Sequence, residues 1–370
     1  MKKIVCLILL ATSCSISVNA QLTSGFYHFK NAATGRYISI NDTDPSNYPV
    51  SQSGDVNMGG IRTYINYDSV AVSPSCVLFI KELGNGKYDI VGQGSSLYNM
   101  ANQKLSINII PNGDGTYKLS GTAKGITKVL SDGSASNSDS WMMNRLAETQ
   151  NWYPIPINTT NEFIGIRPDV KTKDGTYYGT IFAGFNFRLA SDGMAAYYVS
   201  NAYGTGFTMV QIGEDVIPAG TPVIIRCNSA NIKDNKIEPV IGGYEFENSN
   251  WLGGVYCSIN VTKHHNTTPY DWVTMRLLGL SEDGELAFVK DVPAERLYKE
   301  QFLMANKAYL KVNPDDADVM TNGGYSAINN VTTDNNSQTG LYTLTGVRLP
   351  DGKAPRAGIY IRNGKKIIIK

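Results

Sequence analysis

Histidine is rare in this chain, which has only His28, His264 and His265 among its 370 residues. His264 and His265 lie in the polar stretch TKHHNTTP, and the sequence contains no HExxH motif or similar pair at helical spacing. We therefore interpret this pair as part of a plain loop rather than a metal site. A P-loop, a Gly-x-Ser-x-Gly nucleophile elbow and a Rossmann glycine cluster are also missing from the sequence. The sequence therefore predicts a protein that is not an enzyme and that carries no cofactor and no metal.

Charge is also sparse. Charged residues make up 18% of the chain, the net charge is +1, and neither half carries a basic or acidic block. Nucleic-acid binding usually requires a clustered positive face, so this class of protein is disfavoured. After the first twenty residues no stretch approaches the eighteen or so apolar residues of a membrane-spanning helix. The sequence therefore predicts no nucleic-acid partner and no transmembrane span in the mature chain, and it leaves the oligomeric state open.

Residues 1–20 have the pattern of a secretory signal peptide. Lys2 and Lys3 precede an apolar stretch, and the small-residue site VNA ends at Ala20. This pattern predicts cleavage between Ala20 and Gln21 and a secreted or cell-surface location outside the outer membrane. An alternative interpretation uses ATSC, residues 11–14, as a lipobox in which Cys14 is lipidated.

Of the five cysteines, three remain once residues 1–20 are removed: Cys76, Cys227 and Cys257. An exported protein can keep disulfides, and Cys227 and Cys257 both follow apolar runs that look like strands. A bridge between them would close a loop of about thirty residues and stabilise the fold by roughly 3–4 kcal/mol in the chain-entropy model. Two buried free thiols are an equally good interpretation, and Cys76 is expected to be buried.

Tyrosine and glycine, by contrast, are abundant, with 22 and 36 copies. Together with many Asn, Ser and Thr residues, they favour strands and turns and predict an all-β fold. Similar strand starts recur as GFYHF from residue 25, GNGKYDI from residue 84 and GDGTYKL from residue 113. Three such strand pairs predict a closed β-trefoil-like domain over residues 21–160, whose first repeat carries an insertion at residues 41–75. A small barrel or sandwich would show similar hairpins.

From residue 161 the strands become longer and their turns contain proline. Stretches such as GTYYGTIFAGFNFRLA, GTPVIIRC and the hairpin WVTMRLLGLSEDGELAFVKD predict an antiparallel β-sandwich-like domain over residues 161–313. The segment PAERLYKEQFL is expected to form one short helix or an extended loop. Residues 314–339 are mostly polar and small and predict a linker. Residues 340–370 are expected to form a tail of three short strands.

Several of these stretches resemble secreted proteins of the Bacteroidetes. The tail GLYTLTGVRL…AGIYIRNGKKIIIK is similar to C-terminal β-modules that direct type IX secretion and surface anchoring in some members of that phylum. The middle region resembles an uncharacterised β-rich module of Bacteroides and Prevotella exported proteins. The start, GFYHFKNAATGRYISI, is similar to the opening strands of ricin-type β-trefoil lectins. The Gln-x-Trp motif of those lectins occurs once, at Gln150-Asn151-Trp152, which indicates hydrophobic closure of a trefoil more than an inherited sugar site.

The insertion of the first repeat contains the predicted binding residues. Tyr27 and Phe29 share one strand face and are expected to fill the barrel, so binding belongs in loops. Sugar sites combine carboxylates or amides with an aromatic face, and the insertion offers Asp42, Asp44, Tyr64 and Tyr67. Packing of these tyrosines on the neighbouring domain is the alternative.

The predicted function is therefore a secreted, non-catalytic protein that binds glycans or a host or matrix surface. Its expected partners are glycans or surface proteins. A purely structural or adhesive surface component is the alternative from another class. A glycoside hydrolase with a dispersed carboxylate pair is a third interpretation.

Overall fold

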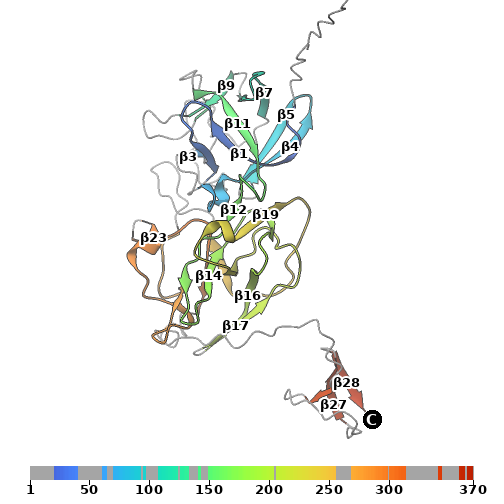
Figure 1. Ribbon diagram of the computed structural model, residues 1–370, viewed down its shortest axis with the longest axis vertical. Helices are drawn as coiled ribbons and strands as arrows, with labels where there is room; N and C mark the ends of the chain where they lie inside the picture. The colour runs from blue at the N-terminus through green and yellow to red at the C-terminus, as the bar shows by residue number, and fades with distance from the viewer. Residues whose placement is uncertain are drawn as a thin grey trace, which may run out of the picture. The chain divides into compact units, whose positions relative to one another are not determined.

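The protein is built from antiparallel β-strands, in agreement with the predicted all-β class (Figure 1). The computed structural model describes residues 21–40, 61–64, 70–92, 95–96, 107–123, 126–132, 141–142, 149–203, 206–255, 268–298, 300–313, 341–343, 358–362 and 365–369. Within these residues, no helix is long and apolar enough to cross a membrane. Short 3₁₀ turns lie between the strands at η2 (Pro74–Cys76), η5 (Ile232–Asp234) and η6 (Ala294–Arg296).

Six strands in the first half close into a barrel. Each pairs antiparallel with the next around the ring β1–β4–β5–β7–β8–β11, and β11 returns to pair with β1. The six strands are β1 (Gly25–Asn31), β4 (Leu78–Gly84), β5 (Lys87–Gly92), β7 (Ile107–Pro111), β8 (Tyr117–Ala123) and β11 (Trp152–Pro156). Closure leaves no free edge in this ring, which removes the risk of pairing with another chain.

Further strands lie along the chain between the two barrel strands of each repeat. The β2 strand (Tyr37–Ile40) pairs with β3 (Ile61–Tyr64), and β9 (Ile126–Ser131) pairs with β10 (Trp141–Met142). The two-residue strand β6 (Ser95–Ser96) pairs with β5. Each of the three predicted repeats therefore contributes two barrel strands with additional strand structure between them.

The barrel interior is filled by the residues that repeat in the sequence. Tyr27, Tyr88 and Tyr117 are buried in one cluster. The apolar residues two positions further along the same strands, which are Phe29, Ile90 and Leu119, belong to the same cluster. Period-two alternation in a strand sends both members of each pair to the same face. The prediction that Tyr27 and Phe29 are core residues is thus confirmed.

Glycine sets the turn between β4 and β5. Gly84, Asn85 and Gly86 all have positive φ, at 86°, 54° and 70°. Glycine and asparagine are the residues that adopt this conformation at least cost. The stretch GNGKYDI therefore begins with a hairpin turn, followed by β5.

In the described residues between positions 161 and 313, the strands form four further sheets. The first holds β12 (Ile164–Gly165), β19 (Lys236–Val240) and β15 (Asn186–Leu189) in that order. The second holds β13 (Val170–Lys171), β14 (Tyr177–Ile181), β18 (Val223–Cys227), β16 (Ala195–Tyr203) and β17 (Gly206–Gln211). The third holds β20 (Leu252–Val255), β25 (Lys307–Lys311), β21 (Met275–Leu280) and β22 (Leu286–Val289), and the fourth pairs β23 (Leu297–Tyr298) with β24 (Phe302–Leu303).

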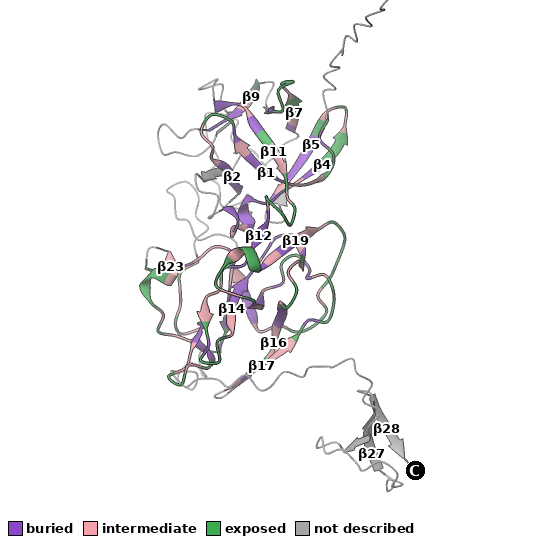
Figure 2. Cartoon of the chain, in the orientation of Figure 1, coloured by how far each residue is buried: buried purple, intermediate pink, exposed green. Residues whose placement is uncertain are grey.

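The central strands of the five-stranded sheet, β16 and β18, are buried on both faces. Figure 2 shows β16 in the colour of buried residues. Along β18, Val223 and Ile225 enter a cluster shared with β12, β15 and β19, whereas Ile224 enters a second cluster shared with β20, β21, β22 and β25. The predicted two-layer sandwich therefore describes only part of this region. A third layer, the sheet of β20, β25, β21 and β22, covers the second face of the five-stranded sheet. The uninterrupted apolar run PVII in the sequence agrees with this, since a strand that is buried on both faces does not alternate.

The segment PAERLYKEQFL, predicted as one helix or a loop, instead forms the turn η6 followed by the short hairpin β23–β24. The hairpin predicted in WVTMRLLGLSEDGELAFVKD is confirmed between β21 and β22, with Gly284 in its turn at a φ of 75°. The β21–β22 hairpin was predictable because turn geometry depends on the residues of the turn itself. The β23–β24 hairpin was not, because strand pairing outweighs the helix-like composition of that segment.

The barrel packs against the region that follows it. Val77, next to η2, belongs to the same buried cluster as Ile164 and Ile166, and Gly165 N–H donates to the Ala71 carbonyl at 2.7 Å. The chain divides into two compact units, Met1–Ile328 and Asn329–Lys370. The predicted boundary at residue 160 thus falls inside one compact unit, and the predicted linker spans the division between the two.

The second unit contains one sheet. Its strands are β26 (Leu341–Thr343), β27 (Gly358–Arg362) and β28 (Lys365–Ile369), with β27 in the centre. Strands β27 and β28 pair antiparallel, with Arg362 opposite Lys365. The two residues between them, Asn363 and Gly364, lie outside the described residues. Asn-Gly is the strongest short-range hairpin signal, so this pairing follows directly from the sequence.

Candidate functional site

The predicted sugar-binding residues fall almost entirely outside the described part of the chain. Asp42, Asp44 and Tyr67 lie outside the described residues. The backbone of Tyr64 ends β3 and pairs with Tyr37 of β2, and the Tyr64 side chain is also outside the described part. Binding by this insertion therefore stays a prediction.

Cys227 is a free, buried thiol. It ends β18 with its side chain turned into the cluster beneath the five-stranded sheet, where Sγ lies 3.7 Å from the Ile225 carbonyl. The structure thus matches the free-thiol alternative at this position and not the bridge to Cys257, which lies outside the described residues. Burial raises the pKa of Cys227 to about 12, and burial likewise raises the pKa of Cys76 to about 12. Both thiols are therefore protonated and poor nucleophiles at neutral pH.

His28 fills a buried polar niche in β1. Its Nδ1 lies 3.0 Å from Oε2 of Glu162, and its ring meets Tyr37 edge-on. The side chain is completely buried, and Nε2 has no hydrogen-bond partner among the described residues. This contact ties the barrel to the segment before β12.

A concave site in the described residues lies where residues 72–74 and β14 meet the sheet that contains β20, β21 and β25. It is a cavity of about 470 Å³, which is within the range of small-molecule sites. Three stretches contribute most of its wall: residues 72–74 from the end of the insertion, residues 165–169, and residues 303–309 leading into β25. The wall contains both apolar side chains, such as Ile181, Leu277 and Leu303, and charged ones.

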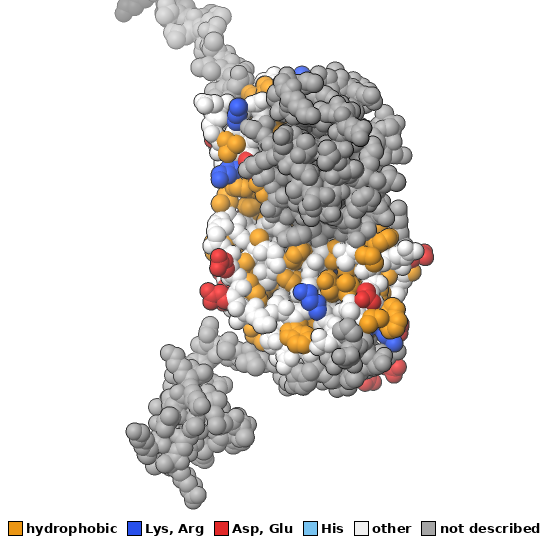
Figure 3. All heavy atoms as spheres, turned by 180° about the vertical axis from the view of Figure 1, so that it is seen from behind, with side chains coloured by type: hydrophobic (Ala, Val, Ile, Leu, Met, Phe, Trp, Pro, Cys, Tyr) orange, Lys and Arg blue, Asp and Glu red, His pale blue; other side chains and the backbone are white. Residues whose placement is uncertain are grey.

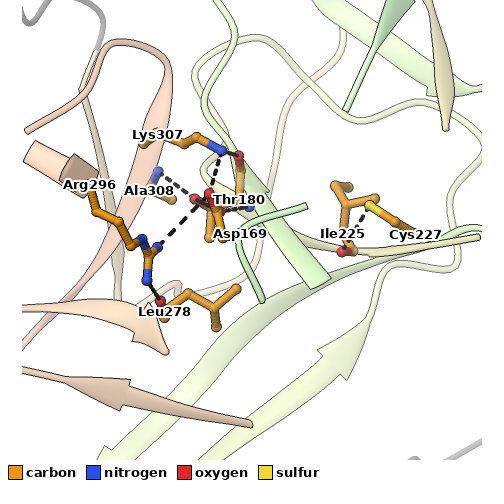
Figure 4. Close-up of polar contacts among 8 residues, drawn as sticks. All are labelled: Asp169, Thr180, Ile225, Cys227, Leu278, Arg296, Lys307 and Ala308. Carbon is orange, nitrogen blue, oxygen red and sulfur yellow. Dashed lines mark hydrogen bonds and ion pairs between the residues drawn. The ribbon is translucent and has the colours of Figure 1, made fainter. Parts of the chain in front are cut away.

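Asp169 is the centre of the polar part of the cavity (Figure 4). Its Oδ1 accepts a hydrogen bond from Lys307 Nζ at 2.7 Å, and its Oδ2 accepts from the Thr180 backbone N–H at 2.8 Å and the Thr180 hydroxyl at 3.2 Å. Arg296 Nη2 lies 3.9 Å from Oδ1. Only 11% of the Asp169 side chain is exposed, so these contacts replace most of its solvation.

The two cations of this cluster keep donor capacity. Lys307 Nζ also lies 3.4 Å from the Thr180 carbonyl, and Arg296 Nη1 donates to the Leu278 carbonyl at 2.5 Å. An ammonium has three donors and a guanidinium has five. Asp169 is therefore nearly saturated, whereas Lys307 and Arg296, with side chains 31% and 24% exposed, can still donate into the cavity.

Sheet packing brings this cluster together. Asp169 lies directly before β13, Thr180 lies in β14, Lys307 begins β25, and Arg296 ends η6. A glycine permits the close approach of the first two segments. A Cβ on Gly179 would lie 3.0 Å from the Arg167 carbonyl oxygen and 3.2 Å from Pro168 Cα. Glycine at this position lets the Arg167–Asp169 segment lie against β14.

No residue of the cluster formed by Asp169, Thr180, Arg296 and Lys307 was identified from the sequence. The only signals were Asp169 after a proline in IRPDV and a lysine that opens the apolar strand KAYLK. Neither signal indicates a partner, because the cluster joins segments more than a hundred residues apart. The described residues contain no group of three or more His, Cys, Asp or Glu side chains that could hold a metal ion.

The surface outside the cavity shows no single sign of charge in the part drawn in colour. Seen from behind, basic and acidic side chains are interspersed among apolar and uncharged ones (Figure 3). A clustered basic face of the kind that nucleic-acid binding requires is therefore not seen on this coloured surface.

Comparison with known proteins leaves the family of the chain open. No protein-family model matches the sequence, and no curated protein matches it. Among solved structures, the chain is similar to a designed 3-fold symmetric protein, ThreeFoil, at 19% sequence identity. The match covers 35% of this chain and 98% of that chain, with a TM-score of 0.24. The barrel is therefore described from its strand pairings and not from this similarity.

Proposed function

We propose that this protein is a non-catalytic glycan-binding protein whose ligand occupies the cavity around Asp169. The observation that carries the proposal is the combination, in one cavity of about 470 Å³, of a satisfied carboxylate, two cations with spare donors and an apolar wall. Sugar rings present both hydroxyl groups and an apolar CH surface. A site with donors, an acceptor and apolar side chains matches both.

Tyr309 supplies the aromatic surface of this site. Its ring packs over Gly253, where an added Cβ would overlap the ring, so the position of the ring depends on that glycine. Burial raises the pKa of Tyr309, so its hydroxyl stays protonated and able to donate at neutral pH. Tyr309 and Lys307 lie two positions apart on β25 and line the same cavity.

We also propose that the barrel is a β-trefoil. Its support is the strand order, in which three successive units each give two barrel strands with additional strand structure between them. The resemblance of its first strands to ricin-type lectins points in the same direction. In this arrangement the barrel carries the insertion that ends at residues 72–74, which form one wall of the cavity.

The test of the binding proposal is a change at Lys307. A glycan array with the purified protein selects the ligand, and titration calorimetry measures its affinity for wild type, Lys307→Met and Lys307→Arg. Loss of a hydrogen-bonding partner costs about 1–3 kcal/mol, so we expect Lys307→Met to bind roughly ten- to a hundred-fold more weakly. Lys307→Arg should retain part of the affinity because it keeps a charged donor.

Lys311→Met is the matched control, because Lys311 lies on the same strand, is exposed and does not line the cavity. Normal binding by Lys307→Met would contradict the proposal. Loss of binding in Tyr64→Ala, Tyr67→Ala or Asp44→Asn, with Lys307→Met unaffected, would move the site to the insertion. Absence of any glycan on the array would favour the structural or adhesive alternative. Release of sugar products would favour a hydrolase.

We further propose that the chain is exported, on the strength of the signal-like residues 1–20 and the tail. Mass spectrometry of the exported protein should show an N-terminus at Gln21, and recovery of a lipidated Cys14 would contradict this. Deletion of residues 338–370 should block delivery to the cell surface if the tail is a sorting signal. Normal surface levels of the truncated protein would rule that role out.

A further inference from the structure

A second cavity adjoins the proposed ligand site. It has a volume of about 390 Å³ and lies along the β21–β22 hairpin, where Gly279, Leu280 and Val289 line it. Asp169 and Arg296 line both cavities. The two cavities therefore meet at this pair of side chains.

Arg296 is placed to contact a ligand from either side of that junction. Its Nη1 is anchored to the Leu278 carbonyl, and its Nη2 lies 3.9 Å from Asp169 Oδ1, beyond hydrogen-bond distance. The remaining N–H groups of the guanidinium fork have no other hydrogen bond among the described residues. A ligand that extended from one cavity into the other would run along the Arg296 guanidinium.

The two cavities differ in charge away from the shared pair. The first has Arg167 and Lys307 against Glu295. The second has Glu282 and Asp291 and, among its described lining residues, no further cation. Arg167, Glu282 and Asp291 are exposed and form no ion pair within the described part of the chain, so these charges remain available to a ligand.

We infer, building on the proposed function, that the ligand is a glycan chain of at least two units. The unit in the first cavity carries an anionic group such as a carboxylate, which Lys307 and Arg167 attract. The unit in the second cavity is uncharged or cationic and presents N–H or O–H donors to Glu282 and Asp291. An acidic sugar linked to an amino or acetamido sugar has this chemistry.

Chain length and charge test this inference together. The probes for titration calorimetry are glucuronic acid, N-acetylglucosamine, their alternating disaccharide and tetrasaccharide, and neutral cellobiose and cellotetraose. Occupation of a second cavity by a linked unit adds contacts without a second loss of translational freedom. We therefore expect the alternating disaccharide to bind about tenfold or more tightly than glucuronic acid, and also more tightly than cellobiose.

The double variant Glu282→Gln/Asp291→Asn isolates the second cavity. It should reduce the affinity of the alternating disaccharide to about that of glucuronic acid alone. Asp283→Asn is the matched control, because Asp283 is exposed in the same turn and does not line the cavity. It should bind the disaccharide as wild type does.

The outcomes separate the two proposals. Equal affinity for single units and disaccharides, or an unaffected double variant, would overturn the inference and leave the proposed function intact. Preference for cellobiose, or selection of a different glycan by the array, would overturn the assignment of an anionic unit to the first cavity. The proposed function would again remain intact. Failure to bind any glycan at all would overturn the proposed function itself.

Discussion

Replacing Trp152 by alanine is expected to lower the free energy of unfolding by about 3–5 kcal/mol, the range for large-to-small changes of a buried aromatic residue. Trp152 is completely buried in the barrel, where its strand pairs with both β1 and β8 and so closes the ring. Its indole Nε1–H donates to the Leu130 carbonyl at 3.2 Å. The variant therefore leaves a cavity and removes the hydrogen bond to the Leu130 carbonyl at the point of closure. Urea denaturation with a barrel-specific probe would measure the loss.

The neighbouring residue provides the control. Tyr153 lies next to Trp152 on β11, but its side chain is 42% exposed. Tyr153→Ala is expected to cost less than about 1 kcal/mol, as exposed substitutions usually do. Trp152→Phe should fall between the two, because it keeps most of the buried apolar area but loses the hydrogen bond. Equal effects of Trp152→Ala and Tyr153→Ala would contradict closure of the barrel through Trp152.

The second large effect is expected at Asp169. Asp169→Asn removes the negative charge that Lys307 and Arg296 face, so both cations lose their counter-ion in a mostly buried position. Breaking a fully buried pair in this way costs about 3–5 kcal/mol, and the partial exposure of both cations reduces this to about 2 kcal/mol. Asparagine keeps an oxygen that can still accept from Thr180. The expected change is therefore mainly electrostatic, and thermal unfolding should show it as a lower melting temperature.

An exposed ion pair is the comparison for this variant. Nζ of Lys173 lies 2.7 Å from Oε1 of Glu285, but the two side chains are 58% and 48% exposed. Glu285→Gln should therefore change the stability by well under 1 kcal/mol. A double variant, Asp169→Asn/Lys307→Met, should recover part of the loss, because it removes one of the stranded cations. If Asp169→Asn is no more damaging than Glu285→Gln, the cluster does not hold the sheets together.

Local features of this protein were predictable from its sequence. The Gly-Asn-Gly turn, the alternation of Tyr27 and Phe29, and the three recurring strand starts all appear in the structure where the sequence places them. Turn geometry depends on which residues tolerate positive φ, and strand faces depend on a period of two. Both properties involve neighbouring residues only, so the sequence by itself determined the all-β class and the repeats of the barrel.

The cavity, by contrast, was decided by the tertiary structure alone. Asp169 meets Lys307 138 positions further along the chain only because the five-stranded sheet is covered on its second face by the sheet that contains β25. On the opposite face of that sheet, packing against β12, β15 and β19 buries Cys227, which is a free thiol. Side-chain partners across layers depend on which sheets stack and in what register. No local pattern in the sequence encodes that choice, because an apolar strand face fits against many possible partners until the whole fold has formed.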